Sequence, residues 1–205
     1  MITIIDYGVG NLFSLSSSLS YLGLGNKVSR DPEDLRKADH IILPGVGAYG
    51  DAIAKLRGSG MAEPLLDEAK AGKPIMGICL GMQLLFDKSY EYGEHQGLGL
   101  IPGVMADLKE DIPANLKVPH MGWNSLHLTE KGKKHPLFKY SKEGDYVYFV
   151  HSFYGKDCDE SLLATSEYGI PVTASAANEN VMGCQFHPEK SGEVGLRILK
   201  AFSEI

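Results

Sequence analysis

The feature that most constrains the fold is an alternation of short apolar runs with helix-like segments through the first half of the chain. The runs at 2–6, 41–43 and 74–78 are rich in Ile, Leu and other apolar residues, which is typical of buried strands. Helical patterns lie between them, for example at 49–57 and 61–71. Strands that alternate with helices predict βαβ units, and hence a mostly parallel sheet with helices on both faces.

The second half of the chain is richer in strand patterns and ends in an amphipathic helix. Residues 146–153 are aromatic and β-branched, 162–166 and 171–176 can pair through a turn, and 181–186 form another apolar run. Residues 193–202 repeat apolar side chains at helical spacing. The two halves together predict an α/β fold, a three-layer α/β/α sandwich with a mixed, mostly parallel central sheet.

Composition and length narrow the classes of protein further. The 205 residues, with 43% hydrophobic residues and a net charge of -6, fit a single globular domain spanning 1–205, and the acidity does not favour nucleic-acid binding. No apolar stretch approaches the roughly 20 residues of a membrane helix, and the N-terminus lacks the basic region of a signal peptide. Three cysteines without Cys-x-x-Cys spacing predict no disulfide framework and no zinc site. We therefore expect a cytoplasmic protein that needs no metal and no cofactor.

The sharpest motif is Gly77-Ile78-Cys79-Leu80-Gly81, where a predicted strand runs into a predicted helix. Small flanking residues allow a tight turn that strains the central residue and exposes its side chain. At a helix N-terminus, free N–H groups favour the thiolate of Cys79, which is the nucleophilic form, and the Leu80 N–H points to where an oxyanion would form. Because free cysteine is often a small buried hydrophobe, the motif alone leaves both roles open.

A second motif, Phe186-His187-Pro188-Glu189, follows the last predicted strand. Pro188 favours an extended conformation at His187, and residues two apart in an extended chain point to the same side. The Glu189 carboxylate can therefore orient the His187 imidazole, which is the oriented base that a cysteine nucleophile needs. A lone histidine at a loop edge is more often structural, but together with the cysteine turn we predict Cys79, His187 and Glu189 as catalytic.

A third motif, Pro44-Gly45-Val46-Gly47, comes directly after a strand. Such a loop can bring backbone N–H groups close to a reacting carbonyl. We expect the backbone at Val46, Gly47 and Leu80 to form an oxyanion site, although a plain strand-end turn is an alternative for the loop.

These motifs, taken in order, resemble the triad-type (class I) glutamine amidotransferases. The run at 77–85, joined to His187-Pro188-Glu189, carries this resemblance. Within that family, four further segments are similar to the glutaminase subunits of imidazole glycerol phosphate synthases. They are Ile5-Asp6-Tyr7-Gly8-Val9-Gly10-Asn11, Pro44-Gly45-Val46-Gly47, Pro119-His120-Met121-Gly122-Trp123-Asn124 and Tyr148-Phe149-Val150-His151-Ser152. Many relatives have Pro-Gly-Gly where this chain has Pro-Gly-Val-Gly, which points to the histidine-pathway branch.

The resemblance implies a mechanism and a binding site. Cys79 would attack the side-chain amide of glutamine and His187 would transfer the proton, so that a thioester forms and water releases glutamate. Gln83 and Glu91 would recognise the amino-acid end of the substrate, although the polar surroundings of Glu91 also fit a solvated loop. The remaining residues of the pocket would contribute mainly their backbone: His151, Ser152 and Phe153. Phe153 stands where relatives often have Tyr, so no hydroxyl contact is expected there.

The resemblance also implies a partner. In this family, ammonia passes to a cyclase subunit, a (β/α)₈ barrel that makes imidazole glycerol phosphate and AICAR. A barrel takes about 250 residues, so we expect it in a second chain, which would form a heterodimer with this one. Met121, Trp123 and Asn124 would face the partner, and the alternative for Trp123 is a core or rim position with no role at an interface. The loop around Val46 would become competent only when the partner holds its ligand.

Three alternatives remain open at this point, one of them a Cys-His-Glu hydrolase that acts on peptides. The chain could be the glutaminase of another synthase, such as pyridoxal phosphate synthase, but that group lacks the His-Met-Gly-Trp-Asn segment. It could also be a non-catalytic regulatory subunit of the same fold, although the joint presence of Cys79, His187 and Glu189 speaks against that reading.

Overall fold

The computed structural model describes all residues from 1 to 205 and is organised around an eight-stranded sheet. The strand order is β2-β1-β3-β4-β14-β13-β12-β9, and the strands from β2 to β14 run parallel whereas the last three are antiparallel. This arrangement confirms the mixed sheet predicted from the sequence. The strands are β1 (Ile2–Ile5), β2 (Asn26–Ser29), β3 (His40–Leu43), β4 (Ile75–Ile78), β9 (His127–Leu128), β12 (Leu162–Glu167), β13 (Pro171–Asn178) and β14 (Val181–Cys184).

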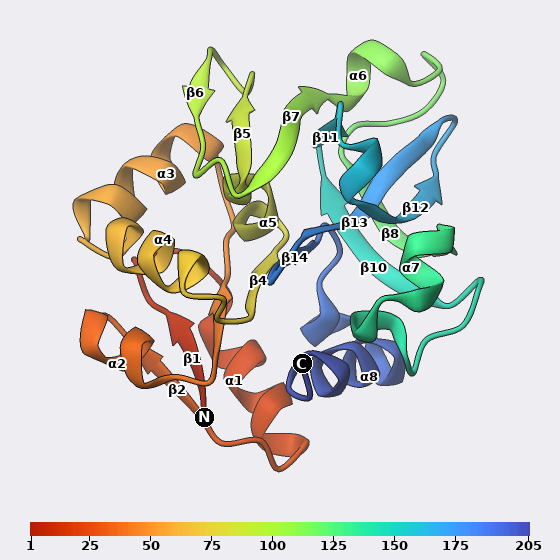
Figure 1. Cartoon of the computed structure of the whole chain (residues 1–205). Helices are drawn as coiled ribbons and strands as arrows, with labels where there is room; N and C mark the ends of the chain where they lie inside the picture. The colour runs from red at the N-terminus through yellow and green to blue at the C-terminus, as the bar shows by residue number, and fades with distance from the viewer.

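Helices cover both faces of this sheet (Figure 1). On one face lie α2 (Pro32–Lys37), α3 (Tyr49–Gly58), α4 (Ala62–Lys70) and α5 (Leu80–Leu85), and on the other lie α1 (Leu12–Tyr21) and α8 (Gly192–Phe202). Shorter helical segments are α6 (Leu108–Asp111), α7 (Glu130–Lys134), η1 (Pro136–Phe138), η2 (Asp159–Ser161) and η3 (Pro188–Lys190). None of the helices has the length and apolar character that crossing a membrane requires.

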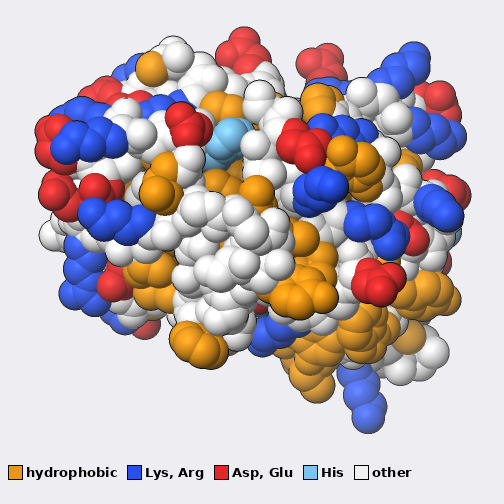
Figure 2. Space-filling view, turned by 90° about the horizontal axis from the view of Figure 1, so that it is seen from below, with side chains coloured by type: hydrophobic (Ala, Val, Ile, Leu, Met, Phe, Trp, Pro, Cys, Tyr) orange, Lys and Arg blue, Asp and Glu red, His pale blue; other side chains and the backbone are white.

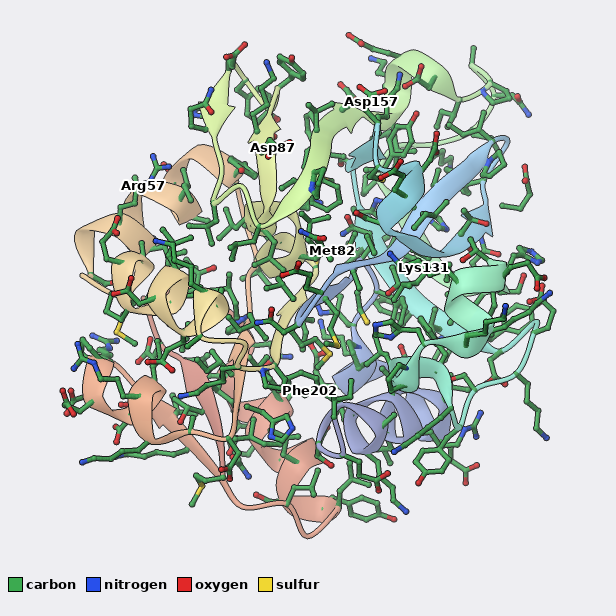
Figure 3. The ribbon with its side chains drawn as sticks, viewed as in Figure 1. Arg57, Met82, Asp87, Lys131, Asp157 and Phe202 are labelled. Atoms are coloured by element: carbon green, nitrogen blue, oxygen red, sulfur yellow. The ribbon has the colours of Figure 1, made fainter.

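Most of the hydrophobic core is divided by the sheet into two clusters, of 25 and 23 buried residues, and a third cluster has 4. Successive strand residues point to opposite faces, and in β3 Ile41 and Leu43 belong to the first cluster whereas Ile42 belongs to the second. Figure 3 shows Met82 near α5 and Phe202 near α8, and these two side chains belong to the first and second cluster respectively. The two clusters confirm the three-layer architecture.

Two smaller sheets extend the fold beyond the prediction. One pairs β10 (Tyr146–His151) with β8 (His120–Ser125), and the other has the order β11-β7-β5-β6. The strands of the latter are β5 (Phe86–Ser89), β6 (His95–Gln96), β7 (Ile101–Asp107) and β11 (Phe153–Lys156). The sequence predicts one strand over 146–153. The structure instead ends β10 at His151 and begins β11 at Phe153, because the residues on the two sides of Ser152 pair in different sheets.

The candidate site lies where the carboxyl ends of the parallel strands meet, as is usual in open α/β sheets. The 44–47 loop follows β3, Cys79 follows β4 and His187 lies shortly after β14. The turn at Cys79 packs so closely on β3 that a Cβ added to Gly81 would lie 1.9 Å from the Leu43 carbonyl oxygen. A glycine at position 81 is therefore a packing requirement of this turn.

Candidate active site

Cys79 occupies the strained turn between β4 and α5. Its φ of 54° and ψ of -113° are rare for a residue with a side chain, which is the strain that the flanking glycines predict. The side chain is 7% exposed and lines a cavity of about 310 Å³. Its Sγ lies 3.8 Å from the Val150 carbonyl oxygen and 3.8 Å from Nε2 of Gln185.

His187 and Glu189 form a buried pair beside this sulfur. Nδ1 of His187 lies 2.8 Å from Oε1 of Glu189, and both side chains are 3% exposed. Burial alone would lower the pKa of His187, but hydrogen bonds to Cys79 and Glu189 outweigh burial and raise the pKa to about 9. The imidazole therefore carries a proton near neutral pH and faces a sulfur acceptor on one side and a carboxylate on the other.

The cavity brings together segments that are far apart in the sequence. Ten of the residues singled out from the sequence line it: Val46, Gly47, Cys79, Leu80, Gln83, Glu91, His151, Ser152, Phe153 and His187. Pro119 and Val150 also line the cavity, and the sequence analysis did not single them out. Glu189 lies outside the lining, on the far side of the His187 ring.

Glu91 and Gln83 are both fixed in the cavity wall. The Glu91 carboxylate accepts a hydrogen bond of 2.6 Å from the Tyr49 backbone N–H, and burial raises its pKa, so this side chain is held in the wall although Tyr92 in the same loop is 91% exposed. Nε2 of Gln83 donates to the Phe153 carbonyl oxygen at 3.3 Å and to Oε1 of Gln185 at 3.0 Å. The Oε1 atom of Gln83 makes no hydrogen bond within the protein and is available to a ligand in the cavity.

A pair of neutral histidines supports the wall from behind. Nδ1 of His151 donates to the Phe153 carbonyl oxygen at 2.9 Å, so its Nε2 accepts from Nδ1 of His120, also at 2.9 Å. Burial lowers the pKa of His151 to about 3 and that of His120 to about 4. Nε2 of His120 accepts in turn from the Asn124 side-chain amide at 3.2 Å. The Asn124 side chain, predicted to face a partner, also donates to the Glu167 carbonyl oxygen at 2.8 Å, so it makes both of its amide N–H contacts within the chain.

The sequence analysis missed Gln185 and the paired roles of His120 and His151. A signal for Gln185 was present, because it stands two residues before His187 and extended residues at that spacing share a side. No comparable local signal exists for the histidine pair, since β8 and β10 bring together residues separated by 31 positions.

The chain matches a known family over nearly its whole length. The sequence model described as glutamine amidotransferase class-I covers residues 3–204. The chain belongs to the class-I glutamine amidotransferases. Two curated relatives of this amidotransferase, both named imidazole glycerol phosphate synthase subunit HisH, are 48% identical to it. One, from Listeria monocytogenes serotype 4a, aligns over 205 residues, 100% of this chain and 96% of its own length. Another, from Wolinella succinogenes, aligns over 207 residues and 100% of both chains.

Solved structures share the fold of this amidotransferase at lower sequence identity. The structure of PurLQS from Thermotoga maritima has a TM-score of 0.76 at 21% identity, covering 99% of this chain and 97% of that one. A crystal structure of a glutamine amidotransferase has a TM-score of 0.75 at 18% identity, covering 99% and 100%. At these identities the likeness extends to the fold, which agrees with the predicted class I architecture.

The surface of the amidotransferase near the cavity carries exposed apolar side chains. Trp123 is 56% exposed and Met121 is 65% exposed, and the Trp123 ring packs edge-on against Tyr148 with ring centroids 6.1 Å apart. This exposure excludes a core position for Trp123 and leaves a rim position and a partner contact open. Figure 2, which views the molecule from below Figure 1, shows a face on which hydrophobic side chains gather toward the lower right, while Lys, Arg, Asp and Glu side chains lie on the left and at the upper right.

Proposed function

We propose that this chain is the glutaminase subunit of imidazole glycerol phosphate synthase, which releases ammonia from glutamine for a cyclase in histidine biosynthesis. The observation that carries the proposal is the strained Cys79 beside the buried pair of His187 and Glu189 in one cavity. The full-length relatives named as subunits of this synthase support the choice of pathway over the pyridoxal phosphate alternative. Three free, buried cysteines fit the reducing cytoplasm.

The geometry supports a two-step hydrolysis. The Cys79 thiolate attacks the side-chain carbonyl carbon of glutamine, and protonated His187 gives its proton to the amide nitrogen as ammonia leaves. The γ-glutamyl thioester that remains is attacked by water, from which His187 takes a proton, and glutamate is released. Glu189 holds the imidazole in the orientation that both steps need, through the 2.8 Å contact to Nδ1.

Backbone and side-chain groups of the cavity hold the substrate. The N–H of Leu80 at the start of α5 and the N–H groups of Val46 and Gly47 stabilise the negative oxygen that forms during each attack. Oε1 of Gln83 and the Glu91 carboxylate receive the α-ammonium group of glutamine. The chain at 151–153 closes the other side of the pocket, and the break between β10 and β11 brings its backbone there.

Exposed apolar residues around the mouth of the cavity support a partner at this surface. Val46 is 41% exposed and lines the cavity itself, and β8 carries Met121 and Trp123 directly after Pro119, which also lines it. A cyclase subunit, a (β/α)₈ barrel bound here as a heterodimer, would receive ammonia without its escape to water. Large aromatic residues are enriched at such contacts.

The test is Cys79→Ala assayed together with the cyclase. We expect glutamine-dependent synthesis to be abolished and synthesis from added ammonia to persist, because the variant lacks only the nucleophile. Cys158→Ala removes another buried thiol away from the cavity and should leave both activities intact. Loss of ammonia-dependent synthesis, or survival of glutamine-dependent synthesis in Cys79→Ala, would contradict the proposal. An inactive wild-type complex would favour the regulatory alternative.

A further inference from the structure

Gln185 is fully buried and contacts the nucleophile. Its exposed fraction is 0%, its Nε2 lies 3.8 Å from Sγ of Cys79, and its Oε1 accepts from Nε2 of Gln83 at 3.0 Å. Its backbone N–H donates to the Ala174 carbonyl oxygen at 2.8 Å, which fixes the main chain beside β13. The hydrolysis described above assigns no task to this side chain.

The orientation of the Gln185 amide follows from its neighbours. The Phe153 carbonyl oxygen can only accept, so the Gln83 amide must turn its nitrogen toward it. The second N–H of that nitrogen points at Gln185, which must present its oxygen there and its N–H to the sulfur. Nδ1 of His151 donates to the same carbonyl and helps to hold it in place. The Phe153 carbonyl therefore fixes the orientation of the Gln83 amide, and the Gln83 amide fixes that of the Gln185 amide.

We propose that Gln185 is a positioning residue that holds the Cys79 sulfur as a thiolate aimed into the cavity, an inference that rests on the proposed glutaminase function. Besides the His187 imidazole that faces it, the sulfur lies between two uncharged groups with opposite preferences. The Val150 carbonyl oxygen can accept a hydrogen bond only from the protonated thiol, whereas the Gln185 N–H can donate to the thiolate. A hydrogen bond to the charged form of a group favours that form.

Two substitutions separate this task from a purely structural one. Gln185→Met removes both the donor and the acceptor, whereas Gln185→Glu retains an oxygen for Gln83 but offers the sulfur no N–H. If Gln185 served only to hold Gln83, Glu would preserve wild-type behaviour and Met would mainly raise KM. If it holds the thiolate, both variants lose reactivity at the sulfur, and Glu loses more because its charge repels the thiolate.

The measurement is the rate of Cys79 alkylation by iodoacetamide as a function of pH on the full chain, with the modified peptide located by mass spectrometry. We expect Gln185→Met to react about tenfold more slowly at neutral pH and Gln185→Glu more slowly still, since a hydrogen bond to a charged group contributes an effect of about tenfold. In the complex with the cyclase, kcat should fall and KM should change little. A wild-type alkylation profile in folded Gln185→Glu would overturn the proposal.

A control and a cross-check complete the design. Ser175→Ala removes another fully buried polar group, whose Oγ donates to the Gly183 carbonyl oxygen at 2.7 Å, and it should retain the wild-type profile. Thermal unfolding of each variant shows whether it is folded before its profile is compared. If alkylation depends on Gln185 but the wild-type complex hydrolyses no glutamine, the glutaminase function fails and the contact with sulfur stands. If glutamine is hydrolysed but the alkylation rate does not depend on Gln185, the glutaminase function stands and the proposed role of Gln185 fails.

Discussion

The two sides of the cavity differ in how tightly they are packed. On the nucleophile side, a Cβ on Gly77 would lie 2.6 Å from the Gly81 carbonyl oxygen, and one on Gly81 would lie 1.9 Å from that of Leu43. On the facing loop, Gly47 has a φ of +95° and nothing within 4 Å of an added Cβ, and its neighbour Val46 is 41% exposed. Segments with few packing contacts open most easily. The core therefore fixes Cys79, whereas the tip of the 44–47 loop at Val46 and Gly47 is open, and we propose that a partner sets its conformation.

The largest effect is expected from Gly81→Ala, on the packed side. The new methyl group would overlap the backbone carbonyl of Leu43, which cannot rotate away as a side chain could. We expect a loss of about 3 kcal/mol or more in the free energy of unfolding, and loss of glutaminase activity with it. Urea unfolding and an assay with the cyclase measure the two. Near-wild-type stability would show that the turn at Cys79 can shift, and would contradict the conclusion that packing fixes it.

The packed side is also the part that the sequence predicts best. The turn at Cys79 and the pairing of His187 with Glu189 depend on local geometry, namely small residues at a strand-to-helix turn and the two-residue period of an extended chain. The alternation of strands and helices likewise sufficed for the parallel sheet. The break at Ser152 was not predictable, because it depends on which distant strands β10 and β11 pair with.

The position of Glu91 could not be predicted from the sequence either, because it also depends on a distant segment. Its own surroundings are polar, and what holds it in the cavity wall is the Tyr49 backbone N–H, 42 residues earlier in the chain. Gln185 shows the opposite case. A local signal existed at two residues before His187, but its task depends on contacts with Cys79 and Gln83 that only the fold supplies.

Glu189→Gln tests the packed side through its pH dependence. The pKa of His187 is raised from 6.5 to about 9, so the stability it contributes is fully present below about pH 6.5 and is lost as the pH rises through about 9. We expect the wild-type free energy of unfolding to fall by about 1–3 kcal/mol across this window, and that of the variant to fall less, because one of the groups that stabilises the imidazolium is neutral.

Denaturant unfolding at pH 6 and pH 9 measures this difference, and kcat should also fall about 100-fold or more because the imidazole loses its charged orienting group. Equal pH dependence in the two proteins would mean that Glu189 does not stabilise the protonated imidazole. Glu143→Gln is a matched control, since Glu143 contacts His127 at the exposed surface, and it should change neither the pH dependence nor kcat.

Gly47→Ala makes the same glycine-to-alanine change as Gly81→Ala, but on the open side of the cavity. The methyl group meets no atom, so the cost comes from the φ of +95°, which strains a residue with a Cβ by about 1–2 kcal/mol. We expect stability to fall by about 1 kcal/mol, glutaminase activity to fall about tenfold as the loop shifts, and Cys79 alkylation to stay unchanged. Gly144→Ala, at a φ of +82° in open space and away from the cavity lining, should show the stability loss without the loss of activity.

Trp123→Ala should have the smallest effect on the chain itself and tests whether a partner completes the open side. The side chain is 56% exposed, so its removal should change the free energy of unfolding by no more than about 0.5 kcal/mol. An aromatic residue at the centre of an interface can contribute about 2 kcal/mol or more to binding, and we expect the complex with the cyclase to weaken about 30-fold.

Tyr21→Ala is the control, because Tyr21 is also an exposed aromatic residue, with an exposed fraction of 80%. It lies at the C-terminal end of α1, whereas Asn11, which lies beside Val46, precedes the N-terminal end of that helix. Titration of the cyclase with each variant measures the affinities. Equal weakening by the two substitutions would mean that the contact surface is not centred on β8.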